Sequence, residues 1–413
     1  MNDRAKVIIW GAGERGAATY NLLLEDDRVE IIGFGDNDTN KTGGVYFDLR
    51  IYNLDTIKEL QDEIDCVLIA IDSGQEVFCQ LKKELRIAVC RDYKAFCKEV
   101  LYMRCSIDIS GWCNARCKYC YTGRRNISGI SYKKEYMKYD GFVRIHNHLI
   151  DAKVIHHFNE IMLYSWGDPL LNNDYLNIIS YLSSQNQVFS ISTNASSLKL
   201  TDCKDAYKTC STVIFSLSGV RPESYKKIHG FDLSIIKNNI KTIIENMREH
   251  GFSGEGKLSF HVYRFNETEL TEAKAFADSL NLKFEPIRAY LASWSLQKDY
   301  LSGGLDPELL NDIKKEIYTD NVEQLISERP GGYRCPLENI LSLDRNGTIE
   351  LCCCCDAGAK EFYWNNIIEI KSLSDWIDYR SRMLECETCV ECRKRGIDYW
   401  ICNGEKLSTD IIN

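Results

Sequence analysis

The stretch Ile107-Asp-Ile-Ser-Gly-Trp-Cys113-Asn-Ala-Arg-Cys117-Lys-Tyr-Cys120-Tyr121 decides the fold of this 413-residue chain. A strand-like run, Arg104 to Ile109, leads into three cysteines with the spacing C-x3-C-x2-C. This spacing supplies three thiolates to one iron–sulfur cluster and leaves the fourth metal of that cluster without a protein ligand. An open position marks a site that binds or activates something. A zinc knuckle is the alternative, although zinc motifs usually pair two C-x2-C units.

The composition is that of an ordinary globular protein, with 27% charged and 44% hydrophobic residues. The net charge of −9, without a strongly basic stretch, argues against nucleic acid or an anionic membrane as the main partner. Three of the first six residues are charged, unlike the core of a signal peptide. No apolar run approaches the roughly 20 residues that cross a bilayer. We therefore expect a soluble cytoplasmic protein.

Nineteen cysteines in such a chain indicate metal or redox use, because a disulfide framework needs a secretory context. Beyond the first triplet they crowd one segment near the end of the chain: Cys335, Cys352 to Cys355, Cys386, Cys389, Cys392 and Cys402. The others are scattered singly, and we interpret most of them as small core residues.

Hydrophobic periodicity divides the chain into three predicted domains. Strands at 5–10, 29–34 and 66–71, alternating with helices, predict a small parallel α/β domain over residues 1–100. Residues 101–330 repeat the same rhythm and predict a partial barrel. Its strands are expected at 104–109, 160–164, 188–192, 213–217 and 257–262, and helices at 233–249 and 269–280. The Pro-Gly-Gly stretch 330–332 is typical of a linker. Residues 331–413 are predicted to form a Cys-rich domain that bound metal stabilises.

The cysteine loop, placed after a strand, resembles that of the radical SAM superfamily. The resemblance implies a partial (β/α)6 TIM barrel and a 4Fe–4S cluster held by Cys113, Cys117 and Cys120. It also implies that the open iron binds the amino and carboxylate groups of S-adenosylmethionine (SAM). One electron, from a donor such as flavodoxin or ferredoxin, then cleaves SAM to a 5′-deoxyadenosyl radical that removes a hydrogen atom.

Downstream motifs agree with this resemblance in their order and in their place at strand ends. Residues 165–170 (Ser-Trp-Gly-Asp-Pro-Leu) resemble the family's Gly-Gly-Glu-Pro motif, with Trp166 for a glycine and Asp168 for the glutamate. Residues 192–195 resemble its ribose-contacting strand end, and residues 216–219 resemble a Ser-Leu-Asp-Gly element with Ser218 in place of the acid. The SAM-binding residues that the resemblance implies are Tyr119, Trp166, Gly167, Asp168, Pro169, Ser192, Asn194 and Ser216.

The C-terminal segment resembles the SPASM or shorter twitch extension of the superfamily. Cys335, eleven residues, Gly347, four residues and Cys352 match its first half, although the short gap before Cys392 departs from its second half. One auxiliary 4Fe–4S cluster is favoured over two, and a zinc ribbon is the alternative. The candidate ligands are Cys335, Cys352, Cys386, Cys389, Cys392 and Cys402. Residues 352–355 are expected not to ligate one site together, because neighbours on an extended segment point to opposite faces.

The first domain carries Gly11-x-Gly13-x-x-Gly16 between a strand and a helix, with Asp36 at the end of the next strand. This context is typical of nucleotide binding. The sequence of this domain resembles Rossmann-like modules of bacterial sugar-modifying enzymes, including the N-terminal domains of nucleotide-sugar acyltransferases. A fold used for assembly or substrate tethering is the alternative, because glycine turns also serve the backbone alone.

These features predict a radical SAM enzyme, an oxidoreductase or epimerase, that acts on a sugar or nucleotide-linked small molecule. A SPASM-type enzyme that modifies a peptide or protein is the second hypothesis. A non-catalytic iron–sulfur electron carrier or redox sensor is the third.

Overall fold

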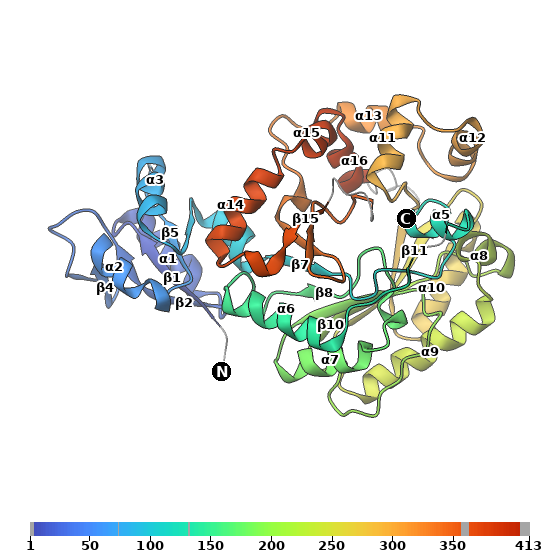
Figure 1. Cartoon of the computed structure of the whole chain (residues 1–413), viewed down its shortest axis with the longest axis horizontal. Helices are drawn as coiled ribbons and strands as arrows, with labels where there is room; N and C mark the ends of the chain where they lie inside the picture. The colour runs from blue at the N-terminus through green and yellow to red at the C-terminus, as the bar shows by residue number, and fades with distance from the viewer. Residues whose placement is uncertain (1–3, 73, 131–132, 357–362, 405–413) are drawn as a thin grey trace. The chain divides into compact units, whose positions relative to one another are not determined.

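The computed structural model describes residues 4–72, 74–130, 133–356 and 363–404. The tips of the first and third predicted domains, residues 1–3 and 405–413, lie outside the described residues. The chain forms two compact units (Figure 1). One comprises residues 1–104, 145–159 and 367–382, and the other comprises 105–144, 160–366 and 383–413. The predicted boundaries near residues 100 and 330 stay a prediction.

The first unit contains a sheet of order β3-β4-β2-β1-β5-β6. Its strands are β1 (Ala5–Trp10), β2 (Val29–Gly35), β3 (Val45–Tyr46), β4 (Leu49–Tyr52), β5 (Cys66–Ile69) and β6 (Ala88–Cys90). All pairs are parallel except β3 with β4. The order reverses between β1 and β5, as in doubly wound sheets. The predicted strands 5–10, 29–34 and 66–71 are confirmed to within two residues.

Four helices accompany this sheet: α1 (Glu14–Leu24), α2 (Leu54–Leu60), α3 (Gly74–Glu84) and α4 (Tyr93–Phe96). A core of aliphatic side chains with Trp10 fills the space between sheet and helices. Because β5 is buried throughout and β1 is buried except at Lys6, both strands appear in the sequence as nearly continuous apolar runs.

The second unit is built on a nine-stranded sheet of order β12-β11-β10-β9-β8-β7-β13-β14-β15. Six strands run parallel in chain order: β7 (Arg104–Ile107), β8 (Ile161–Met162), β9 (Phe189–Thr193), β10 (Cys210–Ser216), β11 (Glu255–Val262) and β12 (Lys283–Arg288). This arrangement confirms the predicted partial barrel. The Cys-rich segment adds β13 (Ile340–Leu343), β14 (Thr348–Glu350) and β15 (Tyr363–Asn366) beside β7.

Helices α7 (Tyr175–Ser184), α8 (Pro222–His229), α9 (Leu233–Glu249) and α10 (Leu270–Ser279) connect the parallel strands. Helix α9 buries Ile236, Ile240 and Ile243 along one face, and the Asp232 carboxylate caps it by accepting from the Ser234 amide at 2.8 Å. The predicted helix 233–249 is confirmed to the residue. The signal was clear because periodicity and cap agree.

A second group of helices belongs to the C-terminal part of the same unit: α11 (Trp294–Ser302), α12 (Pro307–Glu316), α13 (Val322–Ser327), α15 (Glu387–Lys394) and α16 (Ile397–Asn403). In Figure 1, α11, α13, α15 and α16 lie together. Helices α5 (Tyr121–Ile127), α6 (Tyr139–Asp151) and α14 (Leu373–Met383) complete the chain. Within the described part of the chain, no helix is both long and apolar enough to cross a membrane.

Candidate active site

The motif residues follow the carboxyl ends of four neighbouring strands. The cysteine loop follows β7, residues 165–169 follow β8, residues 194–196 follow β9 and residues 217–219 follow β10. Parallel strands in chain order bring these loops to the same end of the sheet, where barrel enzymes bind their ligands.

Asp108 joins the cysteine loop to the loop after β8. Its buried carboxylate accepts hydrogen bonds from the amides of Ser110 (3.2 Å), Gly111 (2.8 Å), Trp166 (3.2 Å) and Gly167 (2.9 Å). Burial raises the pKa of Asp108, and the four amides only partly offset that effect. A Cβ atom on Gly167 would lie 2.5 Å from an oxygen of Asp108. The hydrogen bonds between Asp108 and this loop therefore require glycine at position 167.

The three loop cysteines are half-buried, and Cys120 directly precedes helix α5. Burial raises the pKa of all three thiols. Thiols of this kind act as thiolate ligands when a positive metal centre offsets the cost of their charge. Three half-buried thiols from one short loop therefore fit a 4Fe–4S cluster with one iron open to another ligand.

His229, at the end of α8, contacts Cys117. Its Nε2 accepts a hydrogen bond from the Ser218 amide at 3.2 Å, which places the ring proton on Nδ1. The Nδ1 atom lies 3.4 Å from the Cys117 sulfur and therefore donates to it. Burial lowers the pKa of His229 to about 3, so the ring is neutral. The sequence singled out no role for this residue, because the contact spans more than a hundred positions.

Asn194 makes the corresponding contact with Cys113. Its side-chain amide lies 3.4 Å from the Cys113 sulfur and 3.3 Å from the Asn114 side-chain oxygen. The structure therefore brings Asn194, predicted as a SAM contact, beside a cluster cysteine. Hydrogen bonds of this kind orient thiolate ligands and tune the potential of the cluster.

Asp168 joins the loop after β8 to the end of β9. Its carboxylate accepts from the Thr193 hydroxyl (3.0 Å), the Asn194 amide (2.8 Å) and the Leu170 amide (3.0 Å). Burial raises the pKa of Asp168 to about 6. Pro169 follows directly and starts a short 3-10 turn (Pro169–Leu171). The shorter acid that replaces the family's glutamate thus holds two loops together.

Tyr119, in the cysteine loop, and Trp166, in the loop after β8, are both at least nine-tenths buried. The Tyr119 ring stacks 6.1 Å from that of Tyr263, and its hydroxyl donates to Glu316 at 2.7 Å. The Trp166 indole donates to the Cys355 carbonyl at 2.9 Å. Ser192 and Ser216 lie in the last two residues of β9 and β10. The adenine and ribose contacts assigned to these residues stay predictions.

Known families match both parts of the chain. A model of the radical SAM superfamily matches residues 107–277. The chain therefore contains a radical SAM domain over these residues. A second model, described as C2185-like, N-terminal, matches residues 3–92. The radical SAM family uses a 4Fe–4S cluster and SAM, which are the cofactors that the cysteine loop predicted.

Two solved structures show the level of similarity to known proteins. SuiB of Streptococcus suis bound to SAM is 14% identical over 70% of this chain and 71% of its own, with a TM-score of 0.43. Native anSMEcpe with bound SAM is 13% identical over 70% of this chain and 82% of its own, with a TM-score of 0.44. No curated protein sequence matches the chain.

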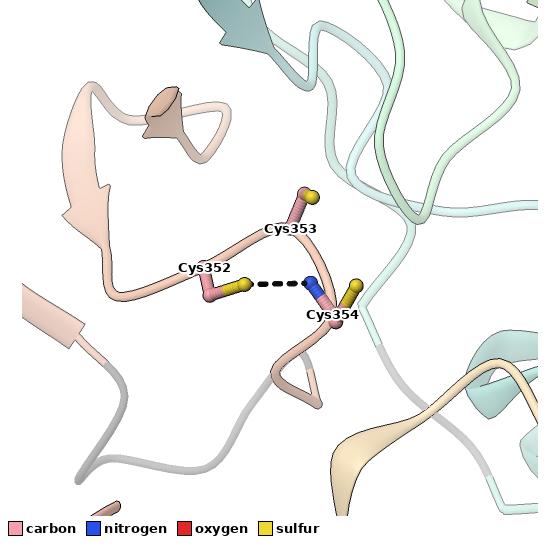
Figure 2. Close-up of side chains that lie close together, drawn as sticks. All are labelled: Cys352, Cys353 and Cys354. Atoms are coloured by element: carbon pink, nitrogen blue, oxygen red, sulfur yellow. Dashed lines mark hydrogen bonds between the residues drawn. The ribbon is translucent and has the colours of Figure 1, made fainter. Parts of the chain in front are cut away.

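The Cys352–Cys355 loop of this radical SAM protein brings three of its four cysteines close together. The sulfurs of Cys352, Cys353 and Cys354 lie within 4.8 Å of one another (Figure 2). The expected alternation of faces does not hold for these three, because the segment is a turn and not an extended strand. Cys355 is not in the group, so the prediction that the four do not all ligate one site is not contradicted. The Cys355 amide donates back to the Cys352 carbonyl at 3.1 Å, and the Cys354 amide lies 3.4 Å from the Cys352 sulfur.

The other C-terminal cysteines surround this loop. A hydrogen bond between two thiols raises the pKa of Cys335 and lowers that of Cys402. The Cys352 thiol acts electrostatically on both and on Cys392. A hydrogen bond from Cys389 lowers the pKa of Cys386 to about 6. Cys335, Cys392 and Cys402 thus all feel the charge of Cys352, and Cys386 interacts with Cys389. Which of these thiols ligate an auxiliary cluster stays a prediction.

The glycine loop of the first unit is explained by backbone geometry. Gly11 has a φ of 120°, and a Cβ on Gly16 would lie 1.9 Å from the Gly11 carbonyl oxygen. Asp36 accepts from the Ala12 amide (3.0 Å), the Asp38 amide and Lys41. Burial alone would raise the pKa of Asp36, but these contacts outweigh burial and lower it. Nucleotide binding by Gly11, Gly13, Gly16 and Asp36 stays a prediction.

Proposed function

We propose that this radical SAM enzyme removes a hydrogen atom from a C–H bond of a sugar or nucleotide-linked small molecule, leading to oxidation or epimerisation. The observation that carries the proposal is the convergence of the Cys113–Cys120 loop with the loops after β8, β9 and β10 at one end of a parallel sheet. A ligand on the open iron would lie beside these loops.

Cys113, Cys117 and Cys120 would hold the 4Fe–4S cluster. When bound, the cluster and SAM supply the one-electron cleavage that yields a hydrogen-abstracting radical. The chain contributes position and environment. Asp108 and Asp168 hold the loops in register, and His229 and Asn194 donate to two of the ligand sulfurs. Flavodoxin or ferredoxin fits as the electron donor.

The group of Cys335, Cys352, Cys392 and Cys402 fits one auxiliary 4Fe–4S cluster, because a cubane takes four thiolates. Such a cluster could accept an electron from a substrate radical, which favours net oxidation. The three converging sulfurs of residues 352–354 leave a zinc ion as the competing occupant. Iron and zinc content of the anaerobically purified chain separates the two.

The substrate class rests on the first unit. Its doubly wound strand order places the Gly11 turn and the N-terminus of α1 at the end of β1, where such sheets bind nucleotides. The acid of the pattern, Asp36, is held by Ala12 and Lys41. A nucleotide would therefore be held mainly by backbone amides of this turn.

Two measurements on the full-length chain test the proposal. Anaerobic reconstitution with iron and sulfide, followed by SAM and dithionite, should yield 5′-deoxyadenosine. Its absence from a fully loaded protein would leave the electron-carrier hypothesis standing in place of the enzyme. Calorimetric titration with UDP- or CDP-sugars should then show binding. No binding of either, together with 5′-deoxyadenosine formation, would favour the peptide-modifying hypothesis.

A further inference from the structure

A cavity of about 100 Å³ lies in the second unit. Its walls come from the end of β12, helix α11, residues 317–319, the Cys-rich loop and the end of α16. The residues that carry chemistry there are Arg288, Tyr290, Gln297, Thr319 and Cys354. Ile317 and Trp400, which belong to a buried apolar cluster, form part of the remaining wall.

Arg288 brings a positive charge without a matching carboxylate. Its guanidinium lies 4.1 Å from the centre of the Tyr318 ring. Its Nε atom is buried and has no hydrogen-bond partner among the residues that the structure describes. Within the same residues, no carboxylate lies at ion-pair distance of Arg288. A partly buried guanidinium of this kind is costly unless an anion binds to it.

Arg264 provides the internal comparison. Its guanidinium also contacts the Tyr318 ring, at 4.5 Å, but it forms an ion pair with Asp320 and its Nε donates to the Ile317 carbonyl at 3.2 Å. The two arginines therefore share a ring and differ in their partners. Only Arg288 lines the cavity.

Gln297 adds a fixed hydrogen-bond acceptor. The side chain is 2% exposed, and its Nε2 donates to the Leu291 carbonyl at 2.8 Å, which sets the direction of the amide. Its Oε1 atom is then left buried, with no partner in the described part of the chain. Buried polar atoms are normally hydrogen-bonded, so an unsatisfied one at a cavity wall points to a ligand.

We propose that this cavity binds an oxyanion of the substrate, a carboxylate or a phosphate. Arg288 binds the anion, and an adjacent O–H or N–H of the same molecule donates to Gln297 Oε1. The guanidinium fork suits both anions. Whole small-molecule ligands occupy roughly 300 Å³ or more, so a cavity of this size holds one end of the substrate. The inference deepens the proposed function and rests on it.

The cavity lies at a different strand from most of the predicted SAM contacts. Those contacts lie mostly on or after β8, β9 and β10, whereas the cavity lies at the end of β12 and includes Cys354. Tyr119, in the loop after β7, belongs to the same apolar cluster as the cavity residues Ile317 and Trp400. The Cys354 carbonyl accepts from the Trp294 amide at 3.0 Å, which fixes the Cys-rich loop at the start of α11. A substrate held by Arg288 would thus lie next to the Cys-rich loop.

Calorimetry on the SAM-loaded, cluster-loaded chain tests the proposal, with inorganic phosphate and acetate as separate probes. At least one should bind, and Arg288→Gln should weaken that binding at least about tenfold, as expected for a charge-assisted contact. The matched control, Arg264→Gln, removes the same charge from the same ring and should change it less than about twofold. Arg288→Lys, which keeps the charge, should fall between them and guards against a folding defect.

The results of this calorimetry distinguish the two anions and test the cavity proposal. Preference for phosphate identifies a phosphorylated or nucleotide-linked substrate, and preference for acetate identifies a carboxylate. No binding of either anion, or equal losses in both glutamine variants, would overturn the cavity proposal. So would a matching loss of SAM affinity in Arg288→Gln, because that residue would then belong to SAM. Failure of the wild type to form 5′-deoxyadenosine is a separate result and bears on the proposed function alone.

Discussion

Two strand-end loops in this chain are organised by the same device, an aspartate that accepts backbone amides. In the first unit Asp36 receives the Ala12 amide of the glycine loop and is balanced by Lys41. In the second unit Asp108 receives four amides and is buried, and Asp168 acts in the same way one strand further along. The electrostatic outcome differs, since the pKa of Asp36 is lowered while those of Asp108 and Asp168 are raised.

The comparison shows that a glycine-rich or acidic motif has two possible uses. The loop after β1 uses its acid and glycines to satisfy its own backbone. The loop after β7 uses Asp108 in the same way and, in addition, carries three half-buried thiols. A chemical role therefore needs groups beyond those that build the loop, and these differ between the two loops: thiols in the cysteine loop, and only backbone amides at the start of α1 in the glycine loop.

The largest expected effect separates the cysteine loop from the other thiols of the chain. Cys117→Ala should reduce 5′-deoxyadenosine formation to the level of the blank without enzyme, because three thiolates are the minimum for an open cluster. Cys203→Ala, at an exposed site of the same unit, should retain wild-type formation. Substantial turnover by Cys117→Ala would contradict the assignment of the loop.

The pH dependence of stability should differ in sign between Asp168 and Asp36. Because the folded pKa of Asp168 is raised to about 6, stability should fall by up to about 3 kcal/mol as the pH rises from about 4 to about 6. The lowered pKa of Asp36 gives stability that is present above about pH 4 and lost below it.

Thermal unfolding of the iron-free chain between pH 3 and pH 8 checks this, with Asp168→Asn and Asp36→Asn as the variants. Asp168→Asn should flatten the fall between about pH 4 and 6, and Asp36→Asn should flatten the loss at lower pH. An unchanged slope in Asp168→Asn would show that its burial does not control this range.

Glycine substitutions should show which positions the two loops need. Gly167→Ala places a Cβ 2.5 Å from an Asp108 oxygen, and Gly16→Ala places one 1.9 Å from the Gly11 carbonyl oxygen. Each should destabilise the chain by about 1–3 kcal/mol or more. Gly13→Ala meets no atom within 4 Å and should change stability by less than about 0.5 kcal/mol. Denaturant titration measures the free energy of unfolding of all three variants. A Gly167→Ala variant as stable as the wild type would argue that the hydrogen bonds to Asp108 do not require glycine.

The smallest effect concerns His229, which has no counterpart in the first unit. His229→Leu removes the donor to Cys117, so the cluster potential should become more negative. Because the cluster is then harder to reduce, 5′-deoxyadenosine formation should slow by about tenfold. His229→Gln can still donate and should recover part of the rate. Redox titration followed by electron paramagnetic resonance gives the potential, and identical potentials in all three proteins would exclude this role.

The sequence alone determined the class of fold and the cysteine motif of the candidate active site. Strand and helix positions such as 5–10 and 233–249 were readable because local periodicity and caps agree with the final packing. The C-x3-C-x2-C spacing was equally local, since the three proposed cluster ligands lie on eight consecutive residues.

Tertiary structure decided everything that depends on contacts between distant segments. The donor from His229 to Cys117 spans 112 positions, and the amides of Trp166 and Gly167 reach Asp108 across more than 50. No periodicity records such pairs. The turn at residues 352–355 also needed three dimensions, because cysteine repeats carry no signal that distinguishes a turn from a strand. Arg288 also needed the fold. That its guanidinium Nε has no hydrogen-bond partner among the described residues can be seen only in the folded chain.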